Sequence, residues 1–191
     1  MNEAKPQKRK FLKTFFKERK QVGAVAPSSR FLVKKMCDSI DFKSAKVIIE
    51  LGPGTGVFTR EILKRASDHT KIFVFELNED FYRILKNKFS DKRIILVNES
   101  AEHLEMTLKS HQVSEADAII SSLPLTVIPE PVKSNIVKAS HQILKRDGIY
   151  VQYQYSLNAK KLIESIFGKL NLRFSLINLP PAFIYFAVKK D

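Results

Sequence analysis

The sequence has a single cysteine, few glycines and prolines, and no apolar run long enough to cross a bilayer. Cys37 cannot form an internal disulfide, and the lack of CxxC pairs and His/Cys clusters argues against a zinc site. We therefore expect a reducing, cytoplasmic environment and no metal. A membrane-spanning helix would need roughly 20 apolar residues. The N-terminal MNEAKPQKRK leads into no apolar signal-peptide core, so export is not expected.

The low content of glycine and proline, 6 and 8 residues, excludes a fibrous or largely disordered chain. A length of 191 residues, of which 44% are hydrophobic, suits one domain that can bury a core without disulfides.

Positive charge is concentrated near the N-terminus. The formal net charge is +13, and residues 1–35 contribute +9, because 11 basic residues there face only Glu3 and Glu18. A basic segment attached to a nearly neutral domain indicates an anionic partner. The charge alone does not decide between nucleic acid and a membrane surface.

Apolar segments of strand length alternate with helical patterns after residue 45. We expect strands at 46–51, 71–76, 93–97, 116–121, 149–155, about 173–178 and 183–189. We expect helices at 57–65, 78–89, 129–144 and 157–167. Asn78 is the expected N-cap of its helix, and an Asp147-Gly148 turn would lead into the fifth strand. The alternation predicts a doubly wound α/β domain whose parallel sheet is covered on both faces, with ligands beyond the carboxyl ends of the strands.

The first strand runs directly into a glycine-rich turn, ELGPGTG, that opens a helix. Glycines at alternate positions let the backbone approach a ligand closely, although a simple turn would also account for them. Glu50 precedes the turn, where it would repel a dinucleotide pyrophosphate but attract the cationic groups of S-adenosylmethionine. Glu76 ends the second strand, where a carboxylate can accept both hydroxyls of a ribose. Together these features predict an S-adenosylmethionine site.

Three stretches of the sequence resemble the bacterial phospholipid N-methyltransferases, which are class I S-adenosylmethionine-dependent methyltransferases. They are GAVAPSSRFL (23–32), ELGPGTGVFTREIL (50–63) and SSLPLTVIPEPVKSNIV (121–137), with VQYQYS (151–156) as a weaker fourth. The resemblance implies a Rossmann-like fold with a seven-stranded, mostly parallel sheet and an extra N-terminal amphipathic helix. It also implies transfer of up to three methyl groups to the amine of phosphatidylethanolamine, or of its mono- and dimethyl forms, towards phosphatidylcholine.

The resemblance assigns the cofactor contacts to residues at the ends of the first four strands. These residues are Glu50, Gly52, Gly54, Thr55, Gly56, Glu76, Leu77, Ser100, Ala101 and Ser121. The glycines and Glu50 would hold the methionine part, and Glu76 the ribose. The family's usual Asp near the adenine is replaced by Ser100, for which Glu99 or Glu102 could substitute.

The turn after the fourth strand is the expected place of the acceptor amine, although an apolar turn broken by proline would have the same sequence pattern. The residues expected to act in catalysis are Ser121, Ser122, Leu123 and Tyr155. Adenine methyltransferases typically have Asn-Leu-Pro-Tyr here, with a polar group for the base amine and an aromatic ring that stacks on the base. This chain has serine first and Leu125 last, which argues against a nucleic-acid base.

Aromatic rings near this turn would attract a methylated ammonium by cation–π interaction. Tyr153 and Tyr185 are expected to bind substrate, and Tyr150 is a further candidate. Strand alternation places Tyr153 and Tyr155 on one face, where core packing is the other interpretation of Tyr153. Backbone carbonyls of residues 121–123, or the hydroxyl of Tyr155, would orient the amine.

Residues 1–40 are expected to form a basic N-terminal unit in front of a methyltransferase domain at 41–191. On a helical wheel, an apolar aromatic stripe lies opposite a lysine-rich face. The residues expected to bind the membrane are Lys10, Phe11, Leu12, Phe15, Phe16 and Lys17. Such a helix suits anionic lipid headgroups, although it could instead dock on its own domain or cover the cofactor.

The APSSR segment that follows is expected to bind lipid phosphate through Arg30 and Ser29. A structural role is the second interpretation of the serines, with Ser28 or Ser29 capping a helix at 30–39.

The leading hypothesis is therefore a monomeric enzyme associated peripherally with the inner face of the cell membrane. Its expected partners are anionic lipids and an aminophospholipid substrate, and not nucleic acid. The main rival is an enzyme like the ribosomal RNA adenine N6-dimethyltransferases, which share the glycine loop but usually carry a C-terminal helical domain for which 191 residues leave no room. Two further hypotheses are a small-amine N-methyltransferase and a non-enzymatic basic binding module.

Overall fold

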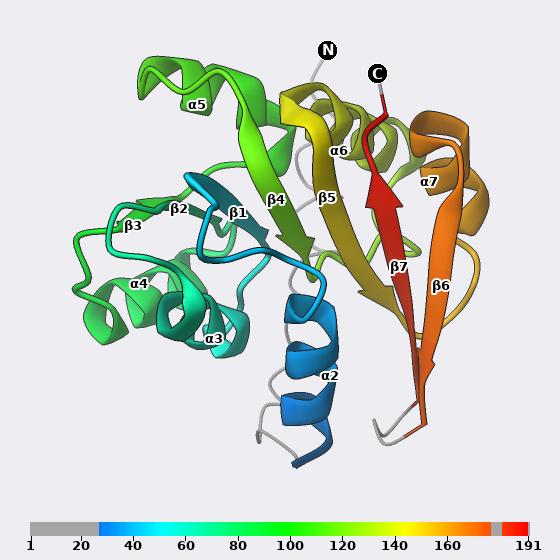
Figure 1. Cartoon of the computed structure of the whole chain (residues 1–191), viewed down its shortest axis with the longest axis horizontal. Helices are drawn as coiled ribbons and strands as arrows, with labels where there is room; N and C mark the ends of the chain where they lie inside the picture. The colour runs from blue at the N-terminus through cyan, green and yellow to red at the C-terminus, as the bar shows by residue number, and fades with distance from the viewer. Residues whose placement is uncertain (1–26, 177–180, 191) are drawn as a thin grey trace.

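The computed structural model describes residues 27–176 and 181–190, and its centre is one seven-stranded sheet (Figure 1). The strands are β1 (Val47–Leu51), β2 (Lys71–Phe75), β3 (Ile94–Val97), β4 (Ala116–Ser121), β5 (Leu144–Gln154), β6 (Leu170–Ser175) and β7 (Ala182–Val188). Their order in the sheet is β3-β2-β1-β4-β5-β7-β6. β7 pairs antiparallel with both β5 and β6, and the other pairs are parallel. The expected Rossmann-like, mostly parallel sheet is confirmed.

Helices cover both faces of this sheet. They are α2 (Pro27–Cys37), α3 (Val57–Arg65), α4 (Glu79–Lys88), η1 (Ala101–His103), α5 (Leu104–Ser110), α6 (Glu130–Ile143) and α7 (Lys160–Phe167). Every residue of β1 is buried, and alternate residues point into different cores. Ile49 and Leu51 join a core with α5, α6 and α7, whereas Ile48 joins a core with α2 and α3. This burial on both faces explains the continuous apolar sequence of the parallel strands.

Two local predictions are wrong. The fifth strand begins at Leu144, because the chain does not turn at Asp147-Gly148 but bulges within β5, where Asp147 has a φ of 61° and the register against β4 shifts. The helix expected at 30–39 begins at Pro27, so Ser28 and Ser29 lie inside its first turn and not at its N-cap. By contrast, Asn78 caps α4 as expected, since its side chain accepts a hydrogen bond from the Phe81 amide at 3.0 Å.

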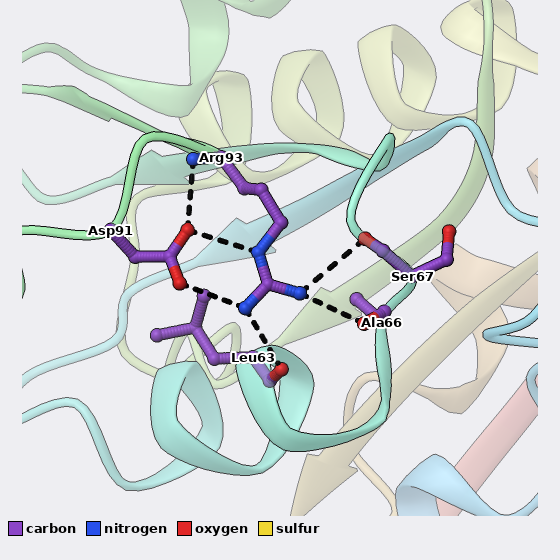
Figure 2. A network of polar contacts seen from close by, with 5 residues as sticks. All are labelled: Leu63, Ala66, Ser67, Asp91 and Arg93. Carbon is purple, nitrogen blue, oxygen red and sulfur yellow. Dashed lines mark hydrogen bonds and ion pairs between the residues drawn. The ribbon is translucent and has the colours of Figure 1, made fainter.

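Arg93 ties the end of α3 to the start of β3 (Figure 2). Its guanidinium donates to the carboxylate of Asp91 at 2.9 and 2.8 Å, and also to the carbonyls of Leu63, Ala66 and Ser67 at 3.2, 2.8 and 3.4 Å. Carbonyls at a helix C-terminus lack partners within the helix, so this side chain satisfies them. The hydrogen bonds from Arg93 lower the pKa of Asp91 from 3.8 to about 2.

We expect Arg93→Ala to lower the free energy of unfolding by about 2 kcal/mol, because several hydrogen bonds to charged groups are lost together. The pKa of Asp91 is lower in the folded than in the unfolded chain, so its stabilisation is present above pH 3.8 and disappears as the pH falls through about 2. Urea titrations at several pH values measure both effects. An Arg93→Ala destabilisation that is as large at pH 2 as at pH 7 would contradict the assignment to Asp91.

Cys37 is completely buried on α2, and burial raises the pKa of its thiol to about 12. Because the thiolate is the reactive form, we expect no reaction with a thiol reagent at pH 8 in the folded protein. One equivalent should react after unfolding in guanidinium. Rapid labelling of the native protein would show that α2 opens readily from the sheet.

Candidate active site

The glycine loop leaves β1 at the carboxyl edge of the sheet, between the ends of two neighbouring strands. The Gly52 amide donates to the Phe75 carbonyl of β2 at 3.0 Å, and the Ser122 amide beyond β4 donates to the Leu51 carbonyl at 2.8 Å. All three loop glycines have positive φ, with values of 69°, 59° and 80° for Gly52, Gly54 and Gly56. Residues with a side chain rarely adopt this conformation, which explains why glycine recurs here.

Glu76 links the loop to the end of β2. Its carboxylate accepts hydrogen bonds from the amides of Gly54 at 3.0 Å and Asn78 at 2.9 Å, and the side chain is buried. The Asn98 side chain donates to the Glu76 carbonyl at 2.8 Å, so the end of β3 is joined to the same residue. Each carboxylate oxygen can accept more than one hydrogen bond, so a carboxylate at this place is of the type that can accept ribose hydroxyls.

Glu50 is a second buried carboxylate, on β1 just before the loop. It accepts a hydrogen bond from the Thr59 hydroxyl of α3 at 2.7 Å. Buried carboxylates are costly unless they are hydrogen-bonded or face a cation. The two carboxylates attract cations and accept hydrogen bonds. They therefore fit the cationic methionine part of S-adenosylmethionine near Glu50 and its ribose near Glu76. A Cβ at Gly52 would lie only 2.8 Å from Leu123 Cδ2, so glycine at this position also lets the loop pack against the turn after β4.

Beyond β2 and β3, three expected cofactor residues differ in their surroundings. Leu77 is half-exposed beside Glu76, and Ala101 is buried in the core. Ser100 is the N-cap of η1, since its Oγ accepts from the Glu102 amide at 3.3 Å. Serine in place of the family's usual Asp therefore has a structural role in this turn. Glu102, which could substitute for that Asp, accepts from the Asn135 side chain at 3.2 Å.

The turn after β4 lies beside the glycine loop. Ser121 and Ser122 are buried, and the Ser121 hydroxyl accepts from the Leu123 amide at 3.4 Å. Leu125 is completely buried in the core. Its side chain is therefore not exposed as a platform on which a base would stack.

Two glutamines of β5 hold this turn, and neither is among the site residues expected from the sequence. The side chains of Gln152 and Gln154 both donate to the Leu123 carbonyl, at 2.9 and 2.8 Å. Both lie in the VQYQYS stretch (151–156) that resembles the phospholipid N-methyltransferases, but that resemblance gave them no role. The available signal was their spacing, because alternate strand residues point to the same face of the sheet.

The candidate tyrosines divide between the two faces of β5 and its neighbour β7. Tyr153 lies between two rings, since it stacks on Phe58 of α3 at 6.2 Å and meets the half-exposed Tyr155 edge-on at 5.8 Å. Tyr150 is fully buried, and burial raises the pKa of its hydroxyl. Tyr185 is also buried, and burial raises its pKa to about 12 while its hydroxyl donates to the Ser156 carbonyl at 2.8 Å.

The residues expected to bind lipid are only partly described. Arg30 is exposed on α2, whereas the side chain of Ser29 and the whole basic segment from Lys10 to Lys17 lie outside the described residues. No helix in the described part of the chain is long and apolar enough to cross a membrane. Within the same residues, no group of three His, Cys, Asp or Glu side chains is placed to hold a metal ion.

The sequence model of the ribosomal RNA adenine dimethylase family matches residues 15–178. The chain belongs to this family. Two relatives differ in the substrate that their names give. The ornithine lipid N-methyltransferase of Singulisphaera acidiphila is 29% identical over 178 residues, which cover 92% of this chain and 93% of that protein. The ribosomal RNA small subunit methyltransferase A of Mycoplasma capricolum is 34% identical over 118 residues, but these cover 60% of this chain and 42% of that protein.

Solved structures establish the fold class. The 1,6-didemethyltoxoflavin-N1-methyltransferase of Burkholderia thailandensis, with bound S-adenosylhomocysteine, has a TM-score of 0.75 at 13% identity and covers 100% of this chain and 92% of its own. The N-methyltransferase NodS of Bradyrhizobium japonicum has a TM-score of 0.65 at 11% identity, with 87% and 99% covered. This member of the dimethylase family has the class I methyltransferase fold and is an S-adenosylmethionine-dependent methyltransferase, as the sequence predicted.

Proposed function

We propose that the protein transfers methyl groups from S-adenosylmethionine to the amine of a lipid headgroup, with phosphatidylethanolamine as the expected acceptor and ornithine lipid as the second. The observation that carries this proposal is the similarity to an ornithine lipid N-methyltransferase over 92% of the chain. The two lipids share a primary amine next to an apolar anchor. The cofactor residues expected from the sequence, above all Glu50, Gly52, Gly54 and Glu76, would bind the methyl donor.

The turn after β4 supports an amine in preference to an adenine base. An adenine acceptor in this position is normally held by a polar side chain and a stacked aromatic ring. Leu125 occupies the place of that ring and is completely buried, so it offers no stacking face. A small aliphatic amine needs no such platform.

Bound S-adenosylmethionine would supply an electrophilic methyl carbon on a sulfonium. The acceptor nitrogen would have to lose a proton, to solvent or to a nearby oxygen, before its lone pair could carry out an in-line displacement at that carbon. This displacement needs alignment more than a strong base, so positioning contributes much of the barrier reduction. The oxygens of Ser121 and Ser122 would orient the amine, with Leu123 beside them.

Exposed apolar side chains near the carboxyl edge would suit contact with lipid. In Figure 1, β4 and β5 end toward the edge where α2 and the hairpin end of β6 and β7 lie. Exposed apolar residues in these parts are Phe31, Val127, Tyr155, Leu157, Phe174 and Leu176. Arg30 and Lys34 are exposed on α2, which adds positive charge for anionic headgroups.

The decisive experiment is mass spectrometry of lipids after incubation of the full chain with S-adenosylmethionine and vesicles. The vesicles contain phosphatidylglycerol with either phosphatidylethanolamine or ornithine lipid. Successive gains of CH₂ on one headgroup are the expected result. No gain on either lipid, in a protein that binds the cofactor, would overturn the proposal.

The second candidate function is dimethylation of adenine in ribosomal RNA, which the family match over residues 15–178 favours. The same assay with small ribosomal subunits and tritiated cofactor separates the two functions.

Deletion of residues 1–20 adds a further test. Under the lipid proposal this deletion lowers vesicle binding and leaves cofactor affinity unchanged.

Tyr155 should matter most for the later methyl transfers. Its exposed ring would attract an ammonium that already carries methyl groups, and cation–π attraction at exposed sites contributes about 0.5–1 kcal/mol. We expect Tyr155→Leu to slow the second and third transfers about 2- to 5-fold relative to the first, whereas Tyr155→Phe retains the ratio. The time course of mono-, di- and trimethylated products measures it. Equal slowing of all steps by Tyr155→Leu would point to a packing role.

A further inference from the structure

The Leu123 carbonyl accepts two side-chain hydrogen bonds from one strand. Gln152 donates at 2.9 Å and Gln154 at 2.8 Å, and both side chains are almost entirely buried. They occupy alternate positions of β5, so they reach the turn beyond β4 from the same face of the sheet. β4 and β5 pair in parallel up to Ser121 and Gln152, which brings the two glutamines alongside that turn.

The orientation of Gln152 is fixed by a further hydrogen bond. The Tyr150 hydroxyl donates to Gln152 Oε1 at 2.9 Å, which directs the amide nitrogen toward Leu123. That nitrogen also donates to the Tyr153 carbonyl at 2.9 Å. Buried polar networks of this kind specify one arrangement when their members are satisfied.

We propose that Gln152 and Gln154 are positioning residues that fix the acceptor turn against the glycine loop. The Leu123 carbonyl also accepts a backbone hydrogen bond from the Leu125 amide at 2.9 Å, so the two glutamines add side-chain anchors to a turn that the backbone itself closes. The inference rests on the proposal that the acceptor lies at this turn. It gives the Leu123 carbonyl the role of an anchor for the turn, beside the oxygens of Ser121 and Ser122 that would orient the amine.

The same hydrogen bonds also place Leu123 against the cofactor loop. Leu123 Cδ2 would lie 2.8 Å from a Cβ at Gly52, so the two loops are in close contact there. A turn that shifts away from this position would separate the acceptor from the methyl donor. Displacements of about 1 Å can cost on the order of 100-fold in rate.

The kinetic test uses Gln154→Met and Gln152→Met, which keep the length of the side chain and remove its donors. With the lipid that the protein methylates as substrate, we expect kcat to fall roughly 10- to 100-fold. KM for this lipid should not fall, and the Kd for S-adenosylmethionine should stay within about threefold. A lower KM for the lipid in either variant would mean that the glutamines compete with the amine for the Leu123 carbonyl and do not position the turn, and that result would overturn the proposal. An unchanged kcat would overturn it too.

The matched control is Thr70→Val. The Thr70 hydroxyl is buried and donates to the Ala45 carbonyl at 2.8 Å, so this variant also loses one buried hydrogen bond to a carbonyl. Thr70 lies just before the amino end of β2, whereas the acceptor turn follows the carboxyl end of β4. This variant therefore shows what a general loss of stability does without a change at that turn. We expect normal kcat from it.

A spectroscopic test needs no substrate, and so separates this inference from the proposed function. Leu123-Pro124 is one of two Leu-Pro steps in the sequence, the other being Leu179-Pro180. Labelling with carbonyl-¹³C leucine and ¹⁵N proline therefore leaves two carbonyl resonances in a carbon–nitrogen NMR spectrum, and the one that disappears in Leu123→Ile is the Leu123 carbonyl. Its ¹³C resonance should move upfield in Gln154→Met and stay in place in Thr70→Val. An unmoved resonance in Gln154→Met would contradict the two hydrogen bonds even if the lipid assay fails.

Discussion

Replacement of Glu76 by alanine is expected to weaken S-adenosylmethionine binding by at least about 100-fold. The carboxylate is buried at the end of β2 and would accept the ribose hydroxyls, and hydrogen bonds to a charged acceptor contribute about 1.5–3 kcal/mol each. The change also removes the acceptor of the Gly54 amide, which stands at 3.0 Å. The glycine loop therefore loses a support at the same time. Isothermal titration calorimetry with S-adenosylmethionine and S-adenosylhomocysteine measures the effect.

Glu79→Ala is the matched control for that experiment. Glu79 lies three residues further along on α4, where it is exposed and pairs with Arg83 at 3.1 Å. Exposed pairs of this kind contribute little, so cofactor affinity should not change. Glu76→Gln keeps the acceptor oxygen but not the charge, and an intermediate loss is expected. A Glu76→Ala protein that binds the cofactor within threefold of the original would remove Glu76 from the ribose site.

The fold could be predicted closely where local signals agree with the long-range packing. The segments 57–65 and 116–121 were predicted as the structure has them, because a glycine loop, apolar periodicity and charged ends all mark the same limits. The start of β5 could not be predicted. Asp147-Gly148 has the sequence of a tight turn, but pairing with β4 and β7 continues the strand through it as a bulge.

The cofactor part of the candidate site was easier to predict than the acceptor part. Glu50 and Glu76 lie at characteristic distances from the glycine loop along the chain, so their spacing alone identifies them as candidate cofactor residues. Gln152 and Gln154 act on a carbonyl about 30 residues earlier in the sequence, at Leu123. The VQYQYS stretch and the alternate spacing mark the two glutamines, but neither identifies the distant backbone atom that they contact. It becomes visible only when β4 and β5 are paired.

The close contact between the two loops gives the second large effect, which is expected from Gly52→Ala. Gly52 has a φ of 69°, and an added Cβ would lie 2.8 Å from Leu123 Cδ2. The left-handed conformation costs an alanine about 1–2 kcal/mol, and overpacking typically adds about 1–3 kcal/mol. We expect S-adenosylmethionine affinity to fall at least about 100-fold, since the loop or the acceptor turn must move.

Gly168→Ala separates strain from crowding in this prediction. Gly168 ends α7 with a φ of 75°, but nothing lies within 4 Å of the position that an added Cβ would take, so the variant carries backbone strain without a collision. Both variants should lower the unfolding midpoint in urea, and only Gly52→Ala should lose cofactor affinity in calorimetry. Adding Leu123→Ala to Gly52→Ala removes the colliding methyl group, and we expect it to restore about tenfold of the lost affinity. A double variant that binds no better than Gly52→Ala would mean that the acceptor turn does not limit the space of the cofactor loop, and that backbone strain at Gly52 accounts for the loss by itself.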